Sequence, residues 1–121
     1  MAREQFQTLT EPMYYILLAL TEECCGVDIM EKVRVISKGR VKVGPGTLYA
    51  MLSKFEENGV IRKTAEEGRR KSYIITEHGN EMLREEYDRL RTMVSDGTGR
   101  IRMQNGNQPD GFPELSFAPS E

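Results

Sequence analysis

The sequence predicts a mainly α-helical fold with one small β-hairpin, arranged as a winged helix-turn-helix followed by a longer C-terminal helix. Three observations carry this prediction. Apolar residues recur at helical spacing in three segments before residue 58, and a Gly-Pro-Gly break separates the second segment from the third. Two short β-branched segments around a glycine then predict a hairpin. A strongly charged segment with a single apolar stripe follows the hairpin and predicts the last helix.

The first helix is predicted to begin at Thr10, whose hydroxyl suits an N-cap, with Pro12 tolerated in the first turn. Its apolar residues recur at i, i+3, i+4 and i+7, namely Met13, Ile16, Leu17 and Leu20. Further large apolar or aromatic residues occupy its other faces. A helix that is apolar over most of its circumference requires burial on two sides, one of which a partner subunit would supply.

The second helix is predicted over residues 27–37, with Ile29, Val33 and Ile36 facing inward. It ends at Lys38-Gly39-Arg40, where glycine suits a C-terminal cap and cations lie near the negative end of the helix dipole. A helix, a turn and a second helix in this order place one helix behind another that is free to enter a DNA groove. Helix pairs of this kind also occur in proteins that bind no DNA.

The third helix follows the break at Gly44-Pro45-Gly46 and is the predicted recognition helix. One stripe of this helix is predicted to be buried, and it consists of Leu48, Met51, Leu52 and Phe55. The opposite face is short, hydroxylic, aromatic and basic, and it consists of Thr47, Tyr49, Ala50, Ser53 and Lys54. Such a helix can be held from behind and laid into a DNA major groove, with its N-terminus suited to a phosphate.

The charge distribution supports this interpretation. The chain has 121 residues and a net charge of −2, which alone argues nothing for nucleic acid. Between residues 32 and 73, however, eleven Lys and Arg face only four Asp and Glu, whereas the remainder has six against fifteen. A basic middle in an acidic chain is the electrostatic footprint of a nucleic-acid-binding surface. The alternative is a solvated surface on which cations cluster by chance.

The predicted hairpin has strands over 60–65 and 70–75 and a turn over 66–69. Arg69, Arg70 and Lys71 lie together at its tip. A hairpin with a cationic tip after a recognition helix forms a wing that reaches phosphates or an adjacent minor groove. Alternatively, cations on an exposed strand block edge-to-edge aggregation.

The last helix is predicted over 77–94, with Thr76 as its N-cap. Its near-heptad apolar stripe indicates pairing with the same helix of a second copy, although packing on the first helix is the alternative. The predicted dimer interface consists of Met13, Tyr14, Leu17, Met82, Leu83, Tyr87, Leu90 and Val94. These boundaries give a DNA-binding domain over 9–75, a dimerisation helix over 76–95 and a flexible tail over 96–121, which is rich in Gly, Pro and polar residues.

Other functional classes find little support in the sequence. No segment has the length of a transmembrane helix or the pattern of a signal peptide, so a cytoplasmic protein without membrane association is expected. Cys24 and Cys25 are neighbours and are expected to act as small buried hydrophobes, with a thiol switch as the alternative. No metal site, cofactor motif or catalytic motif is evident, and His78 is the only histidine, so we expect no enzyme activity.

With these segments assembled, the chain resembles the PadR family of bacterial transcriptional regulators. The resemblance rests on GPGTLYAMLSKFEENGVI from residue 44 to 61 and GRRKSYIITEHGNEML from residue 68 to 83, with weaker support from the first helix. It implies a winged helix-turn-helix homodimer, held by its first and last helices, that binds a palindromic promoter site and usually represses. By position, it implies DNA contacts from Thr47 and Tyr49 in the recognition helix and from Arg70 and Lys71 in the wing.

The sequence therefore predicts a sequence-specific regulator that binds double-stranded DNA as a homodimer. The predicted DNA-binding residues are Lys38, Arg40, Lys42, Pro45, Thr47, Tyr49, Ser53, Lys54, Arg69, Arg70 and Lys71. A winged helix used only for contacts with an acidic protein is the alternative. A small hydrophobic effector is a further hypothesis, against an interface core without ligand, and its pocket would consist of Tyr14, Tyr15, Met82, Tyr87 and Met93.

Overall fold

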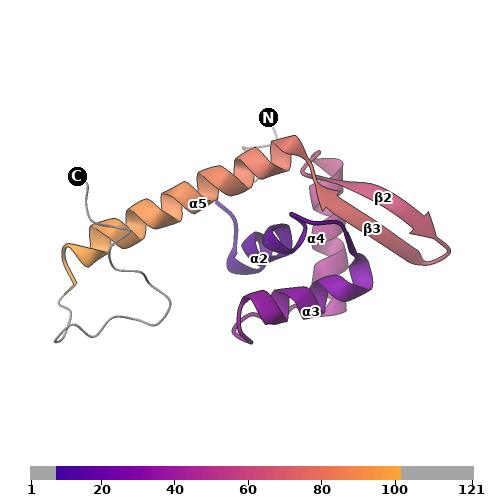
Figure 1. Ribbon diagram of the computed structural model, residues 1–121, viewed down its shortest axis with the longest axis horizontal. Helices are drawn as coiled ribbons and strands as arrows, with labels where there is room; N and C mark the ends of the chain where they lie inside the picture. Colours follow the sequence, from indigo (N-terminus) through magenta and orange to yellow (C-terminus); the bar gives the residue numbers. More distant parts are fainter. Residues whose placement is uncertain (1–7, 102–121) are drawn as a thin grey trace. The chain divides into compact units, whose positions relative to one another are not determined.

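The computed structural model of this protein describes residues 8–101 (Figure 1). The elements follow in the order α2 (Glu11–Ala19), β1 (Cys24–Cys25), α3 (Gly26–Ile36), α4 (Pro45–Glu57), β2 (Ile61–Glu67), β3 (Arg70–Ile75) and α5 (Glu77–Thr98). This mainly α-helical fold with a small antiparallel sheet confirms the predicted fold class. The described residues fall into two compact units, one ending at Arg84 and one beginning at Glu85, so that α5 contributes to both.

The first unit is built around the helices α2, α3 and α4. Their predicted apolar stripes form one core, in which Leu48 and Phe55 of α4 are fully buried. Ile16 and Leu17 of α2, together with Ile29 of α3, are also fully inaccessible to solvent. Because this core covers one side of α4, the opposite side of that helix is left at the surface.

The sheet contains one strand that the sequence did not reveal. Its order is β1-β3-β2, all antiparallel, and the two-residue strand β1 pairs Cys24 with Tyr73 and Cys25 with Ser72. A strand of two residues is too short to show the period-two alternation on which strand prediction depends. Its pairing fastens the start of α3 to the wing strand β3.

The hairpin is longer than predicted, because β2 extends to Glu67 and leaves only Gly68 and Arg69 in the turn. Gly68 has a φ of 59°, a left-handed conformation that two-residue hairpin turns favour and that glycine adopts without strain. A register irregularity between Lys63 and Ala65 interrupts the pairing with β3. Figure 1 shows the β2–β3 hairpin extending away from the cluster of α2, α3 and α4.

Helix α5 begins at a tight junction with the end of α4. The Thr76 hydroxyl accepts a hydrogen bond from the Gly79 backbone N–H at 3.0 Å and lies 2.6 Å from the Gly59 carbonyl oxygen, to which it donates. The Thr76 backbone N–H donates to the Val60 carbonyl oxygen at 2.9 Å. The predicted N-cap at Thr76 is thereby confirmed, and the cap also joins α5 to the loop after α4.

Two local expectations were wrong. Ile36, predicted to face inward, is 38% exposed because α3 ends at that residue and the chain turns away through Lys38, whose φ is 57°. The last helix continues past residue 94 to Thr98, whose hydroxyl donates to the Val94 carbonyl, so the first residues assigned to the flexible tail are helical. The remainder of that predicted tail, from residue 102 onward, lies outside the described residues. Within residues 8–101, no helix combines the length and apolarity needed to span a bilayer.

Candidate nucleic-acid interface

Helix α4 presents a polar surface opposite its buried stripe. The side chains of Thr47, Ser53 and Lys54 are exposed, and Tyr49 is 42% exposed. The helix starts at Pro45 after Gly44, and no side chain among residues 8–101 caps its first turn. The first N–H groups of the helix are therefore free of a side-chain cap, which is the arrangement that suits binding of a phosphate oxygen.

A groove of about 290 Å³ lies between α4, the start of α3 and the tip of the wing. Arg69, Arg70 and Lys71 line its wing side, while Tyr49 and Ser53 line its α4 side. The three cations are exposed, and their side chains form no ion pair or hydrogen bond within the described part of the chain. Because cations and hydroxyl groups line it together, the groove has the chemistry of a site for an anionic, hydrogen-bond-accepting group.

The floor of this groove is apolar and includes Leu52 and Tyr73. Burial raises the pKa of the Tyr73 phenol, so this ring remains neutral at physiological pH. The start of α3 completes the lining with Cys25, Gly26 and Val27. None of the groove residues contributed by α3 or by the floor was among the predicted DNA-binding residues, because none of them carries a charge and Leu52 was assigned to the buried stripe of its helix.

Gly26 brings α3 close to the recognition helix. A Cβ atom at this position would lie 3.2 Å from both Cε1 and the hydroxyl oxygen of Tyr49. This separation is tighter than ordinary packing, so glycine lets the Tyr49 ring lie against the first residue of α3. The Tyr49 side chain therefore leans into the groove rather than straight out from the axis of α4.

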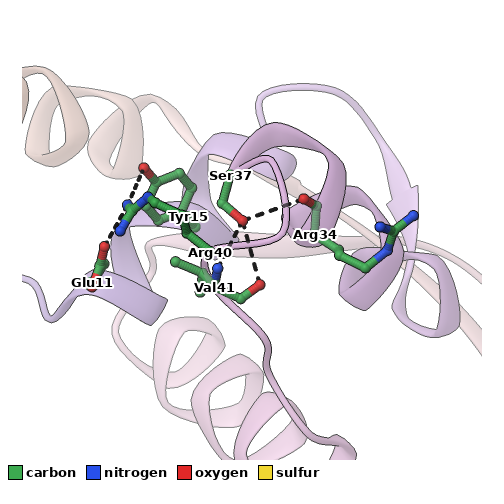
Figure 2. Close-up of polar contacts among 6 residues, drawn as sticks. All are labelled: Glu11, Tyr15, Arg34, Ser37, Arg40 and Val41. Atoms are coloured by element: carbon green, nitrogen blue, oxygen red, sulfur yellow. Dashed lines mark hydrogen bonds and ion pairs between the residues drawn. The ribbon is translucent and has the colours of Figure 1, made fainter. Parts of the chain in front are cut away.

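Arg40 lies outside the groove and is engaged within the protein (Figure 2). Its Nη2 atom donates to Glu11 Oε2 at 2.6 Å and to the Tyr15 hydroxyl at 3.2 Å. The hydrogen bond that Arg40 donates to Glu11, followed by the one it donates to Tyr15, raises the pKa of Arg40 above its usual range. Arg40 thus connects the loop after α3 to α2, and a contact with phosphate would compete with this ion pair.

Ser37 holds the same loop in shape (Figure 2). Its buried hydroxyl accepts from the Val41 backbone N–H at 3.0 Å and lies 3.4 Å from the carbonyl oxygens of Arg34 and Val41. These contacts satisfy a buried N–H in the loop that leads into α4. The loop carries Lys38 and Lys42, which are both exposed.

The structure thus brings together five of the predicted DNA-binding residues, namely Tyr49, Ser53, Arg69, Arg70 and Lys71. The other six are exposed but do not line the groove, namely Lys38, Arg40, Lys42, Pro45, Thr47 and Lys54. Their contact with DNA, like that of the first five, stays a prediction.

The residues predicted to form a dimer interface differ in exposure. Leu17, Met82 and Leu83 are buried within the core of the single chain. Met13 and Tyr14 are half-buried at the edge of that core. Met13 and Tyr14 are therefore more accessible to a second copy than the three buried residues.

In the second unit, α5 exposes 46% of Tyr87 and 54% of Met93, while Leu90 and Val94 are half-buried. Along the helix, Arg89 Nη2 forms an ion pair with Glu86 Oε2 at 2.5 Å. The Arg91 guanidinium lies over the Tyr87 ring, 5.8 Å from its centre. The dimer interface and the effector pocket both stay predictions. The rings of Tyr14 and Tyr15, two of the predicted pocket residues, pack edge to face with their centres 5.7 Å apart.

Cys24 and Cys25 are free thiols. Burial raises the pKa of Cys24 above its usual range, so its reactive thiolate form is disfavoured at neutral pH. For Cys24, this supports the expected role as a small buried hydrophobe.

The protein is a winged helix-turn-helix, because α2 and α3 are followed by α4, which has one exposed side, and then by a hairpin with a cationic tip. The sequence matches the Transcriptional regulator PadR-like family over residues 16–85, which is more than half of the chain. The protein belongs to this family. No curated protein sequence matches the chain significantly.

Solved structures of transcriptional regulators share the fold. A transcriptional regulator from Clostridium thermocellum is 20% identical, with a TM-score of 0.63 over 78% of this chain and 100% of that one. A PadR family regulator from Eggerthella lenta is 23% identical, with a TM-score of 0.58 over 76% and 81% of the two chains. Bacillus subtilis PadR in complex with operator DNA is 21% identical, with a TM-score of 0.53 over 85% of this chain and 55% of that one.

Proposed function

We propose that this protein is a DNA-binding transcriptional regulator that acts as a homodimer and represses transcription from a palindromic promoter site. Helix α4 would enter the major groove, and the wing would contact the flanking backbone. Membership of a family of transcriptional regulators supports the regulatory role. The similarity of fold to a PadR protein in complex with operator DNA supports DNA as the ligand.

The observation that carries the proposal is the juxtaposition of α4 with the cationic tip of the wing. One flank of the exposed side of α4, with Tyr49 and Ser53, lines a groove together with Arg69, Arg70 and Lys71 of the wing, although the two segments are far apart in the sequence. A helix that projects polar side chains beside a cluster of cations matches both needs of DNA recognition, which are base contacts and phosphate neutralisation.

The dimer follows from a different feature. A single copy of α4 would contact only one half-site, whereas two copies related by a two-fold axis would bind two half-sites of a palindrome. The part of α5 that belongs to the second unit exposes Tyr87 and Met93, which are large enough to pack against a partner helix. Repression is the regulatory outcome expected where such a dimer occupies a promoter.

The test is selection of bound fragments from the source genome, followed by a mobility-shift titration of the enriched sequence. The proposal predicts retardation at low salt, a two-fold symmetric consensus and a stoichiometry of two chains per site. No retardation at low salt would refute DNA binding and favour a winged helix used for contacts with an acidic protein. Retardation with one chain per site would leave DNA binding intact and refute the dimer.

Repression is tested separately by placing a reporter gene behind the enriched sequence. The proposal predicts lower reporter expression when the protein is present, and expression restored by Arg70→Ala. Higher expression in the presence of the wild-type protein would contradict repression and indicate an activator.

A further inference from the structure

The exposed side of α4 divides into two flanks. Successive residues of an α-helix are rotated by about 100°, so Tyr49 and Ser53 lie on one flank while Thr47 and Lys54 lie on the other. Only the first pair lines the groove beside the wing. The small residue Ala50 is exposed between the two flanks. The sequence alone treated all of these residues as one face of the recognition helix, but the structure separates them.

The Tyr49 side chain is held on the wing flank by α3. Its ring and hydroxyl lie against Gly26, where an added Cβ would come within 3.2 Å of both. Part of the ring is consequently covered, and 42% of the residue stays exposed. The hydroxyl therefore has a fixed location beside the groove instead of sweeping freely across the outer face of α4.

The polar groups around the groove fit one kind of ligand. Arg69, Arg70 and Lys71 can only donate hydrogen bonds, and the hydroxyls of Tyr49 and Ser53 can also donate. No acidic residue belongs to the lining as the described residues define it. A phosphate group accepts hydrogen bonds on every oxygen and carries the opposite charge, whereas a base edge presents a mixture of donors and acceptors.

We infer that this groove seats one phosphate of the DNA backbone, so that Tyr49 and Ser53 fix the register of the protein on the duplex and do not read bases. This inference rests on the proposed function, because it assigns roles within the same surface. Base reading then falls to Thr47, Ala50 and Lys54, which lie outside the groove. Gly26 is a positioning residue, since it acts on DNA only through the location of the Tyr49 ring.

The first experiment compares Tyr49→Phe with the wild-type protein on two duplexes, the enriched operator and a mixed-sequence control. Removal of a hydroxyl that donates to a charged group is expected to weaken both affinities by about tenfold. The ratio of the two affinities should stay unchanged, because a backbone contact carries no sequence information. A loss confined to the operator would show that Tyr49 reads a base and would overturn the inference, as would no loss on either duplex.

The second experiment locates the phosphate. Methylphosphonate groups, which are uncharged, replace the backbone phosphates of the operator one position at a time. At one position in each half-site, the wild-type protein should lose affinity while Tyr49→Phe should lose markedly less, because the two changes remove the same contact. Equal losses for both proteins at every position would contradict a phosphate seated at Tyr49.

Gly26→Ala provides a graded test of the positioning. The added methyl group should displace the Tyr49 ring and weaken binding to both duplexes, but it should have little further effect in a Tyr49→Phe background. Gly97→Ala, in α5, is the matched control for introducing a methyl group and should bind like the wild type. Additive losses from Gly26→Ala and Tyr49→Phe would show that Gly26 does not act through the Tyr49 hydroxyl.

The same side chains would accept a phosphate from a small molecule, so a last arm separates the two sources. Inorganic phosphate and chloride are compared at equal ionic strength by thermal unfolding of the free protein. A seat for duplex DNA predicts the same non-saturating rise in phosphate for the wild type and Tyr49→Phe, because phosphate is excluded from protein surfaces and stabilises folded proteins in general. A saturable rise in phosphate that Tyr49→Phe abolishes would overturn the inference and indicate a site for a free anion. If the wild type binds neither duplex, the proposed function itself fails.

Discussion

Replacing Gly79 by alanine should severely destabilise the protein. Gly79 lies in the first turn of α5, and a Cβ atom there would sit 2.1 Å from the Val60 carbonyl oxygen and 2.8 Å from Cγ1 of Ile75. Carbon and oxygen atoms that are not bonded approach no closer than about 3.3 Å even in favourable C–H···O contacts. The start of α5 would therefore have to move by roughly 1 Å.

The magnitude follows from what this movement would disturb. Overpacking of a tight site costs about 1–3 kcal/mol. The shift would also strain the hydrogen bonds by which Thr76 joins the carbonyl oxygens of Gly59 and Val60, and each hydrogen bond contributes about 1 kcal/mol. We expect Gly79→Ala to lower the free energy of unfolding by roughly 3–5 kcal/mol in total.

Urea denaturation followed by circular dichroism measures this loss, with Gly97→Ala in the same helix as the control. A Cβ atom at Gly97 would approach only Cδ1 of Ile101, at 3.4 Å, and alanine favours helix over glycine by about 1 kcal/mol. The control should therefore match or exceed the wild type in stability. If Gly79→Ala were as stable as the wild type, the close junction between α5 and Val60 would be refuted.

Three further outcomes are expected. Arg70→Ala should reduce the slope of log affinity against log salt by about 0.9 for each protomer in contact with DNA. The control Arg62→Ala, on the same hairpin but outside the groove, should change this slope less. Equal slopes for the wild type and Arg70→Ala would exclude a phosphate contact at Arg70. Ser37→Ala should lower the free energy of unfolding by about 1–3 kcal/mol, because the buried Val41 N–H loses its acceptor, and an unchanged urea midpoint would contradict this. In a Cys25→Ser background, iodoacetamide should modify Cys24 far more slowly in the folded protein than in urea, as mass spectrometry would measure. Rapid modification of the folded protein would show that the thiol is accessible. Because burial raises the pKa of Cys24, the thiol ionises at a lower pH in the unfolded chain than in the folded protein. The free energy of unfolding should therefore fall as the pH rises above the ordinary pKa of a cysteine thiol.

The helical part of the fold could be predicted because its packing is local. The stripe Leu48, Met51, Leu52 and Phe55 repeats at the period of a helix, and the structure buries all of it except Met51, which is half-buried against the core. The cap at Thr76 was equally visible, since hydroxyl residues favour this position and Glu77 follows it. Local signals of this kind need only a few neighbouring residues.

The groove could be predicted only in part. Its cations were evident as a cluster in the sequence, but the participation of Gly26 and Tyr73 depends on the pairing of β1 with β3, which joins residues about fifty positions apart. The orientation of Tyr49 could not be deduced either, because it is set by the absence of a side chain on a different helix. The ion pair of Arg40 with Glu11 likewise joins distant segments, so the sequence alone left Arg40 as a free cation.

The central claim is that α4 and the tip of the wing form one DNA-binding surface. Backbone amide chemical shifts, recorded during titration of the folded protein with operator DNA, test it most directly. We predict that the largest shifts fall on residues 44–54 and 68–71, with smaller changes at the start of α3. Shifts concentrated in α2 or in the second half of α5, with the wing unperturbed, would contradict the claim.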